Sequence, residues 1–210
     1  MERNKAYLAF DPNDVAFHGT YDGKEIEYQV PKEKTRTLYD GRYCAVAGFI
    51  FGVIQGKYCV LANKRGVGTP DFQGYWNCPC GFLERGENSC EGIARETAEE
   101  CGVLIDVSKF KPIYVQTEPE KCNNGNVTIH HVAFVGNRVA LNTEVKAKDL
   151  GDFFNKIRGE INEVSDVSWI PVDNIDNFKW AFYHEESIAK YMPPKWKRRI
   201  IEWYYKIFKK

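Results

Sequence analysis

The chain has 210 residues and a formal net charge of zero, with 43% hydrophobic and 28% charged residues. This is an ordinary soluble composition, and the length suits one sizeable core. Zero net charge argues against a protein held on nucleic acid by phosphate neutralisation. No apolar run approaches transmembrane length, and residues 1–14 lack the apolar stretch of a signal peptide. We therefore expect a cytoplasmic protein with neither a membrane nor a nucleic acid as partner.

Cysteine usage is consistent with a reducing compartment. The chain has seven cysteines, an odd number, at irregular spacings. Free thiols fit this pattern better than a disulfide framework. Only one residue separates Cys78 from Cys80, which is too close for the usual zinc-binding pair. We expect neither disulfides nor a structural zinc ion.

The N-terminal part is predicted to be a strand-rich extension. The segments Val15–Tyr21 and Lys24–Val30 flank Asp22-Gly23, a strong β-hairpin turn signal. Composition and chain-breaking residues divide the chain into three parts: this extension (residues 1–40), a main domain (41–192) and a C-terminal amphipathic helix (193–210).

Strand signals and loop signals alternate in the main domain. Tyr43–Gln55 is nearly all apolar, as expected of a strand buried on both faces, and Lys57–Asn63 returns as a second strand. Lys64–Tyr75 is a glycine-rich loop. Later in the chain, three further strands are predicted at Pro112–Thr117, Asn126–Gly136 and Asn162–Pro171. A turn-rich loop is predicted at Glu118–Gly125 and a short helix at Lys148–Arg158.

Capping signals enclose a helix from Ser89 to Cys101. Asn88 is a good N-cap residue, Glu91 completes a capping box, and Gly102 is the expected stop. We expect the Thr97 hydroxyl to bond back to the preceding turn. Small residues at helical spacing form a stripe to bury: Cys90, Ala94, Thr97 and Cys101.

Glu96 and Glu100 make the end of this helix unusual. No cation lies three or four residues away from either of them. Like charges at i, i+4 cost about 0.2–0.5 kcal/mol. Carboxylates in the last turn also face the negative end of the helix dipole, at roughly 0.3–1 kcal/mol each. A break with local rules indicates a functional site, and a divalent cation would turn the repulsion into ligation, since Mg²⁺ prefers oxygen ligands.

The stretch from Gly81 to Val103 resembles the Nudix box, G-x5-E-x7-R-E-U-x-E-E-x-G-U, in which U is aliphatic. Thr97 stands where an aliphatic residue is usual, and Val103 fills the final position. The fixed positions all match: Gly81, Glu87, Arg95, Glu96, Glu99, Glu100 and Gly102. Such a match arises by chance roughly once in ten million registers. The resemblance covers about residues 43–191 and implies the Nudix-type α/β/α sandwich around a mixed β-sheet.

The resemblance also implies a function and a set of ligands. Nudix hydrolases cleave the diphosphate linkage in a nucleoside diphosphate joined to another group, with Mg²⁺ or Mn²⁺ as cofactor. By position, the metal ligands are the Cys80 backbone carbonyl and the carboxylates of Glu96, Glu99 and Glu100. The family usually carries W-x-L-P-G-G before the box, where this chain has WNCPCG. A carbonyl needs no particular side chain, so Cys80 can still serve.

Other box residues are implied to have positioning roles. Glu87 and Arg95 would form an ion pair that fixes the loop to the helix. Gly81 and Gly102 would serve backbone geometry. The general base differs among relatives: it is either a box glutamate, here Glu96 or Glu99, or a glutamate from a later loop. Glu163 is our first candidate outside the box, followed by Glu118, Glu120 and Glu160.

Substrate choice depends on residues outside the box. Arg65 is a candidate for binding a phosphate through its guanidinium fork. Trp76, Phe82 and Tyr183 are candidates for stacking a base. The extension resembles the N-terminal strand units of ADP-ribose pyrophosphatases, which favours ADP-ribose or NADH-type substrates and a homodimer. A nucleoside triphosphate substrate, or a non-catalytic nucleotide-sugar sensor of the same fold, is the alternative.

Two helices are predicted at the C-terminus. The first starts at Trp180 and runs to about Tyr191. The second follows Pro193-Pro194, and its apolar residues recur at helical spacing: Trp196, Ile200, Trp203, Tyr204, Ile207 and Phe208. Basic residues supply much of the remainder. We expect the apolar side to pack on the domain or at a subunit interface, although a membrane surface or another partner would also suit a basic amphipathic helix.

Overall fold

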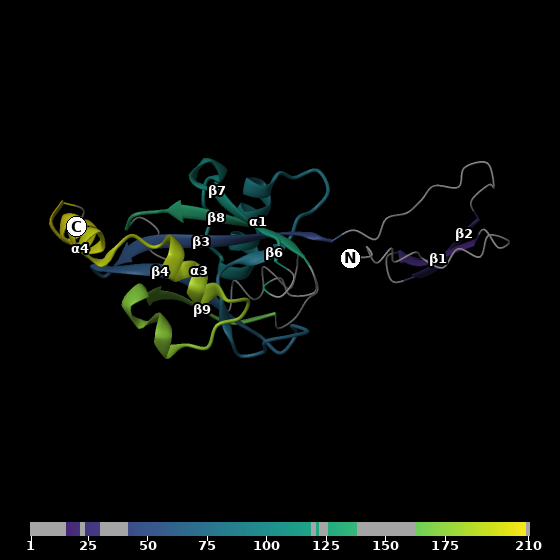
Figure 1. The fold of residues 1–210 in the computed structure, drawn as a ribbon, viewed down its shortest axis with the longest axis horizontal. Helices are drawn as coiled ribbons and strands as arrows, with labels where there is room; N and C mark the ends of the chain where they lie inside the picture. The colour runs from purple at the N-terminus through teal and green to yellow at the C-terminus, as the bar shows by residue number, and fades with distance from the viewer. Residues whose placement is uncertain are drawn as a thin grey trace. The chain divides into compact units, whose positions relative to one another are not determined.

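The computed structural model describes residues 16–21, 24–29, 42–118, 121, 126–137 and 163–208. The chain divides into two compact units, Met1–Arg42 and Tyr43–Lys210 (Figure 1). In the first unit β1 (Ala16–Tyr21) pairs antiparallel with β2 (Lys24–Gln29), which confirms the predicted hairpin. The helix predicted at residues 148–158 lies outside the described residues.

The second unit is built on a seven-stranded mixed sheet. Hydrogen-bonded neighbours follow the order β5-β4-β3-β8-β7, with β6 beside β3 and β9 beside β4. β3 and β8 run parallel, and the other described pairs are antiparallel. The strands are β3 (Cys44–Ile54), β4 (Lys57–Arg65), β5 (Trp76–Asn77), β6 (Cys80–Phe82), β7 (Lys111–Gln116), β8 (Val127–Phe134) and β9 (Val164–Pro171).

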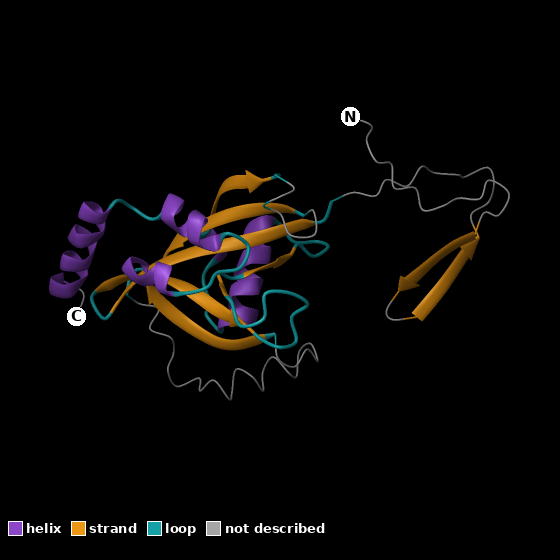
Figure 2. Ribbon diagram, turned by 60° about the horizontal axis from the view of Figure 1, so that its bottom comes forward, coloured by secondary structure: helices purple, strands orange, loops and turns teal. Residues whose placement is uncertain are grey.

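Helices cover both faces of this sheet, as predicted (Figure 2). On one face α1 (Ser89–Cys101) packs Ile93 and Cys101 into a core cluster with residues of β3 and β4. On the other face lie the 3₁₀ helix η4 (Val172–Asn177), α3 (His184–Tyr191) and α4 (Lys195–Phe208). A further 3₁₀ turn, η2 (Val107–Lys109), follows α1.

β3 is the strand that separates the two halves of the core. Val46 and Ile50 belong to the cluster beneath α1, whereas Phe49 and Phe51 belong to the cluster beneath α3. All four are essentially inaccessible to solvent. Side chains alternate between the faces of a strand, so a strand with helices on both sides must be apolar at successive positions. The prediction of a strand buried on both faces is confirmed.

α1 has the predicted bounds and caps. Both hydrogen bonds of the Asn88–Glu91 capping box are present. Gly102 ends the helix in the left-handed region at φ 66°, where glycine carries no Cβ penalty. The Thr97 hydroxyl donates to the Ile93 carbonyl at 2.6 Å, as expected from its place in the helix.

α3 begins later than predicted. The stretch from Trp180 was expected to be helical, but the helix starts at His184 because Phe182 and Tyr183 have φ values of 60° and 56°. Left-handed residues cannot continue a right-handed helix. Trp180 is instead buried, with its indole N–H donating to the Ile175 carbonyl at 2.8 Å.

α4 packs on the domain with a different face from the predicted one. Arg198 is buried and binds Asp173 at 2.6 Å, and Glu202 accepts a hydrogen bond from the Tyr58 backbone N–H at 2.7 Å. Ile201 and Tyr205 on the same side of the helix pack against the core. Of the two expected places for the Trp196–Phe208 stripe, the domain does not apply, because these polar anchors set the rotation of the helix; a subunit interface stays a prediction. No helix in the described ranges is long and apolar enough to cross a membrane.

Candidate active site

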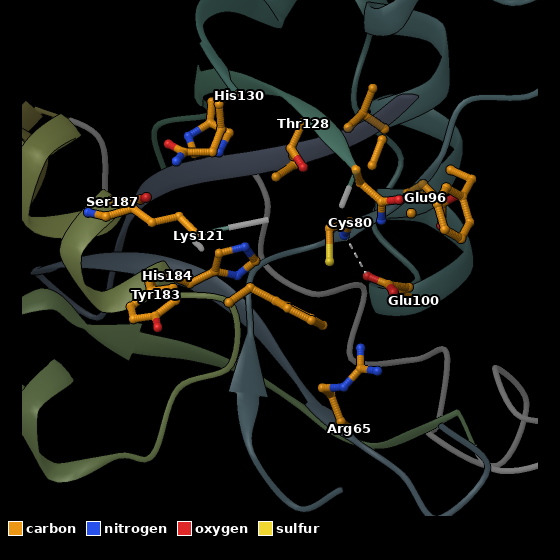
Figure 3. A pocket seen from close by; sticks show the side chains of 18 of the residues that line it. Arg65, Cys80, Glu96, Glu100, Lys121, Thr128, His130, Tyr183, His184 and Ser187 are labelled. Carbon is orange, nitrogen blue, oxygen red and sulfur yellow. Dashed lines mark hydrogen bonds between the residues drawn. The ribbon is translucent and has the colours of Figure 1, made fainter. Parts of the chain in front are cut away.

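A cavity of about 590 Å³ opens beside the N-terminal half of β3. Its walls come from β3, β6, α1, β7, β8 and α3, together with the loop after β4. In Figure 3 Glu96 and Glu100 lie on one side, Tyr183 and His184 lie on the opposite side, and Cys80 lies between them. The cavity therefore joins the Nudix-like box to segments far from it in sequence.

Glu100 is held at the acidic end by two donors. Its Oε2 accepts from the Asn63 side-chain amide at 2.7 Å and from the Cys80 backbone N–H at 3.0 Å. Burial raises the pKa of Glu100 well above its usual value, and the neighbouring Glu96 charge adds to this rise. The two hydrogen bonds act in the opposite direction. A cation bound here would likewise favour the ionised carboxylate.

Glu96 lies beside Glu100 and is 8% exposed. Its carboxylate occupies the space that a Cβ on Gly81 would need, so Gly81 permits the helix to approach β6 closely. Arg95 donates to Glu96 Oε1 at 2.7 Å. The expectation that no cation is within local reach of Glu96 was wrong, because the adjacent Arg95 turns its long side chain back to the carboxylate.

Arg95 links the box together. Its guanidinium binds both oxygens of Glu87, at 3.0 and 2.7 Å, and the Phe82 carbonyl at 3.0 Å. The predicted ion pair between Glu87 and Arg95 is therefore present. Arg95 also donates to Glu99 at 2.9 Å, and hydrogen bonding to Glu87 is the main reason why the pKa of Arg95 is raised. Glu99 is turned towards Arg95 and is not among the described residues that line the cavity.

Two carboxylates, rather than a complete cage, are available for a cation. Within the described ranges, no three His, Cys, Asp or Glu side chains converge as a metal-binding group. Mg²⁺ is commonly held by one or two carboxylates together with substrate phosphates. Glu96, Glu100 and the backbone at Cys80, all on the cavity wall, fit that kind of site. Cys80 lies in β6 and is not among the described residues with positive φ, so the usual glycine is not required here.

The opposite end of the cavity is cationic and aromatic. Arg65 lies between this end and the acidic end, below Glu100 in Figure 3, and its charge acts to lower the pKa of Glu100. Its guanidinium binds Asp71 and lies 4.8 Å from the centre of the Phe182 ring. Tyr183 is 48% exposed and lines the cavity, as do Lys121 and Lys190. The Lys190 ammonium is 3.9 Å from the centre of the Tyr114 ring. This end suits an anionic ligand with a flat ring system.

Two buried histidines pack behind this end, and sequence patterns did not indicate their role. His184 Nδ1 accepts from the Cys78 backbone N–H at 2.9 Å, and burial lowers the pKa of His184 to about 3. His130 bonds the Tyr191 hydroxyl at 2.8 Å, and burial lowers the pKa of His130 to about 4. Both rings are therefore neutral at pH 7. An isolated histidine in a strand or helix carries no spacing signal that would have identified it.

The remaining predicted residues divide by location. Arg65, Phe82 and Glu163 line the cavity. Trp76 is not among its described lining residues, because its side chain packs on the core and against Phe178. Glu118 lines the cavity, whereas Glu120 and Glu160 lie outside the described residues. The six described cysteines are free, as expected.

Comparison with known proteins identifies the family. The NUDIX domain model matches residues 45–191. The chain belongs to the NUDIX family. The prediction of a Nudix hydrolase is thereby confirmed, and the match covers the strands and helices that build the cavity.

Individual relatives agree with this assignment. The chain is 27% identical, over 83% of its length, to 88% of an ADP-ribose pyrophosphatase from Methanocaldococcus jannaschii. The NUDIX domain of Shewanella oneidensis NrtR, solved with ADP ribose, superposes with a TM-score of 0.57 and 20% identity, over 72% of this chain and 87% of that one. A MutT/nudix family protein from Enterococcus faecalis superposes with a TM-score of 0.54 and 18% identity, over 85% of this chain and 66% of that one. At these identities the structural matches show the fold.

Proposed function

We propose that this Nudix hydrolase cleaves the diphosphate linkage of a nucleoside diphosphate joined to another group, with ADP-ribose or an NADH-type dinucleotide as substrate. The observation that carries the proposal is the two-sided cavity. Glu96 and Glu100 line one end, and a cationic and aromatic wall lines the other. A dinucleotide-like molecule has a diphosphate for the first end and a base or sugar for the second. The name of the archaeal relative, an ADP-ribose pyrophosphatase, supports this substrate class.

In this proposal Glu96, Glu100 and the Cys80 carbonyl hold Mg²⁺ or Mn²⁺ together with substrate phosphate oxygens. When bound, the cation neutralises the diphosphate and lowers the pKa of a water molecule. Glu99 is the weaker ligand candidate, because Arg95 already binds it at 2.9 Å. Arg95 and Glu87 keep the helix and the preceding loop in register, and Gly102 ends α1 so that Glu100 stays in its last turn.

The attacking water must lose a proton to a carboxylate. Glu163 lines the cavity just before β9, and its backbone carbonyl accepts from Gly66 N–H at 2.6 Å, which ties its segment to the loop after β4. We propose Glu163 as the base, with Glu96 and then Glu99 as the box alternatives. Glu118 is a weaker candidate, because its carboxylate already accepts from Gln116 at 2.8 Å and Thr117 N–H at 3.1 Å.

Substrate binding is proposed along the whole cavity, with Arg65 and Phe82 near the acidic end and Tyr183 at the opposite end. The Arg65 fork is oriented by Asp71 and stacked on Phe182, so it can meet a phosphate with little loss of side-chain freedom. Phe82 and Tyr183 are each about half exposed on the cavity wall and offer faces for a base. A homodimer and a cytoplasmic location stay predictions. The free thiols of the described cysteines support the latter.

The test is phosphate-coupled turnover with Mg²⁺ on ADP-ribose, NADH, nucleotide sugars, diadenosine polyphosphates and nucleoside triphosphates. Wild type is compared with Glu100→Gln and with Glu91→Gln, which alters a carboxylate of the same helix outside the cavity lining. We expect turnover of ADP-ribose or NADH, its loss in Glu100→Gln and its retention in Glu91→Gln. Turnover of triphosphates alone would replace the substrate assignment. Tight binding of ADP-ribose without cleavage of any panel member would instead indicate a sensor.

A further inference from the structure

α4 presents an apolar face to solvent at the end of the domain. Six of its large apolar side chains are each between 44% and 66% exposed: Trp196, Ile200, Trp203, Tyr204, Ile207 and Phe208. They recur at helical spacing and so share one side of the helix. Scattered exposed apolar residues are ordinary, but a contiguous stripe of this kind marks an interaction surface.

The opposite side of α4 is already committed to the domain. Arg198 is buried against Asp173, and Glu202 binds the Tyr58 backbone N–H. Tyr205 packs on the core beside them, with its ring centre 6.0 Å from that of Phe134. Turning the stripe inwards would break both of these contacts with the domain and leave the Tyr58 backbone N–H without its acceptor. The exposed stripe is therefore a stable feature of the fold rather than a core face waiting to close.

Charge around the stripe has one sign. Every exposed charged residue in the described part of α4 is basic: Lys195, Lys197, Arg199 and Lys206. Lys195, Arg199 and Lys206 follow one edge of the stripe at i, i+4 and i+11, and Lys197 lies at its other edge. The acidic member of the helix, Glu202, faces the domain. The outer surface thus combines aromatic and aliphatic groups with a basic border.

We propose that α4 docks the protein on an anionic lipid surface. The apolar stripe would enter the boundary between headgroups and acyl chains, where tryptophan and tyrosine are favoured, and the basic border would meet anionic headgroups. This differs from spanning a bilayer, and it replaces our expectation from sequence that no membrane is a partner. The inference is independent of the proposed hydrolytic function.

A second copy of the chain is the less suitable occupant. If two copies of α4 packed antiparallel through their stripes, each edge of one stripe would lie beside the same edge of the other copy. If they packed parallel, each edge would lie beside the opposite edge of the other copy. Both edges of the α4 stripe are basic, so either arrangement brings like charges together. An anionic surface removes that repulsion.

Docking through α4 leaves the cavity accessible. α4 contacts the domain at Tyr58, next to the turn between β3 and β4, whereas Ala45 and Ala47 line the cavity at the other end of β3. Figure 1 shows α4 at the end of the sheet away from β6. Lipid binding and catalysis can therefore be tested separately.

The experiment is flotation of the full chain with phosphatidylcholine vesicles, with or without about one-third phosphatidylglycerol. We expect about tenfold more protein on the anionic vesicles, falling at high salt. The double variant Trp203→Ser/Ile207→Ser should lose about tenfold of this binding or more, while Leu104→Ser, which removes an exposed leucine elsewhere, should not. Far-UV circular dichroism verifies that each variant is folded.

Charge reversal gives the matched control for the basic border. Arg199→Glu/Lys206→Glu should reduce binding to anionic vesicles about tenfold or more, whereas Lys109→Glu/Lys111→Glu, with the same change in net charge, should have little effect. Equal effects of the two pairs, or equal binding to neutral and anionic vesicles, would overturn the proposal. Sedimentation equilibrium tests whether a second copy of the chain covers the stripe instead. A wild-type dimer that Trp203→Ser/Ile207→Ser dissociates, together with no binding of the wild type to vesicles, would assign the stripe to a second copy.

Discussion

The two ends of the cavity are built in different ways. At the acidic end Cys80, Glu96 and Glu100 lie within one short stretch, and the Asn63 amide is the contribution from outside that we identify. At the other end the wall comes from β7, from the loop before β8 and from α3 with the residue before it. A site within one stretch can be recognised from residue spacing. A site assembled from separate segments has no such signature.

The two ends also differ in rigidity. The Arg95 guanidinium ties Glu87, Glu96 and Glu99 into one network. The side chains of Tyr183 and Lys121 at the other end are about half exposed. Preorganised groups serve chemistry, whereas exposed groups adapt to ligands. We therefore expect substitutions at the acidic end to reduce kcat and substitutions at the aromatic end to raise KM.

The largest effect is expected from the carboxylates. Glu96→Gln and Glu100→Gln should each reduce kcat about a thousandfold, because the cation site that we propose depends on both charges. Glu99→Gln should cost less, since Arg95 already binds that carboxylate. Steady-state kinetics on the substrate found by the panel measures this, with Glu91→Gln as control. A Glu99→Gln defect larger than that of Glu100→Gln would contradict our ligand assignment.

Arg95→Lys should have the next largest effect. Lysine cannot contact both oxygens of Glu87 and also reach Glu96 and Glu99, so kcat should fall about 10- to 100-fold. The midpoint of thermal unfolding should fall as well. Arg85→Lys, on the exposed loop before α1, is the matched control. Unchanged kcat in Arg95→Lys would show that the bidentate contact does not position the site.

At the aromatic end Tyr183→Leu should raise KM about tenfold and change kcat less than about twofold, as expected for the loss of one stacking face. Tyr204→Leu on α4 makes the same change far from the cavity and should leave both constants unchanged. A fall in kcat without a rise in KM would transfer Tyr183 from substrate binding to the chemical step.

The smallest effect concerns stability against pH. The pKa values of His184 and His130 are lowered to about 3 and about 4, from a usual value near 6.5. At a pH between each lowered pKa and about 6.5, the unfolded chain therefore binds more protons than the folded chain. The free energy of unfolding consequently falls as the pH drops below about 6.5. His130→Gln should flatten the fall in thermal midpoint between pH 6.5 and 4. An unchanged slope would show that other groups control it.

Sequence patterns predicted the local structure well wherever adjacent residues decide it. The caps at Asn88 and Gly102, the buried strand β3 and the hairpin in the extension all depend on neighbours in the chain. Two local arguments were incomplete. α3 begins later than its sequence pattern indicated, because Phe182 and Tyr183 have left-handed backbone conformations. α4 packs with a different face from the apolar one, because Arg198 binds Asp173 on the domain.

The sequence by itself determined the family and the acidic half of the candidate site, because the spacing of box residues on one helix and its preceding loop is a local property. Only the tertiary structure decided that Arg65, Tyr183 and Lys190 face the same cavity, that Trp76 packs on the core, and that α4 turns its apolar stripe outwards. Those outcomes depend on which distant segments the sheet brings together and on which polar groups find buried partners. Neither is encoded in the periodicity of any one segment.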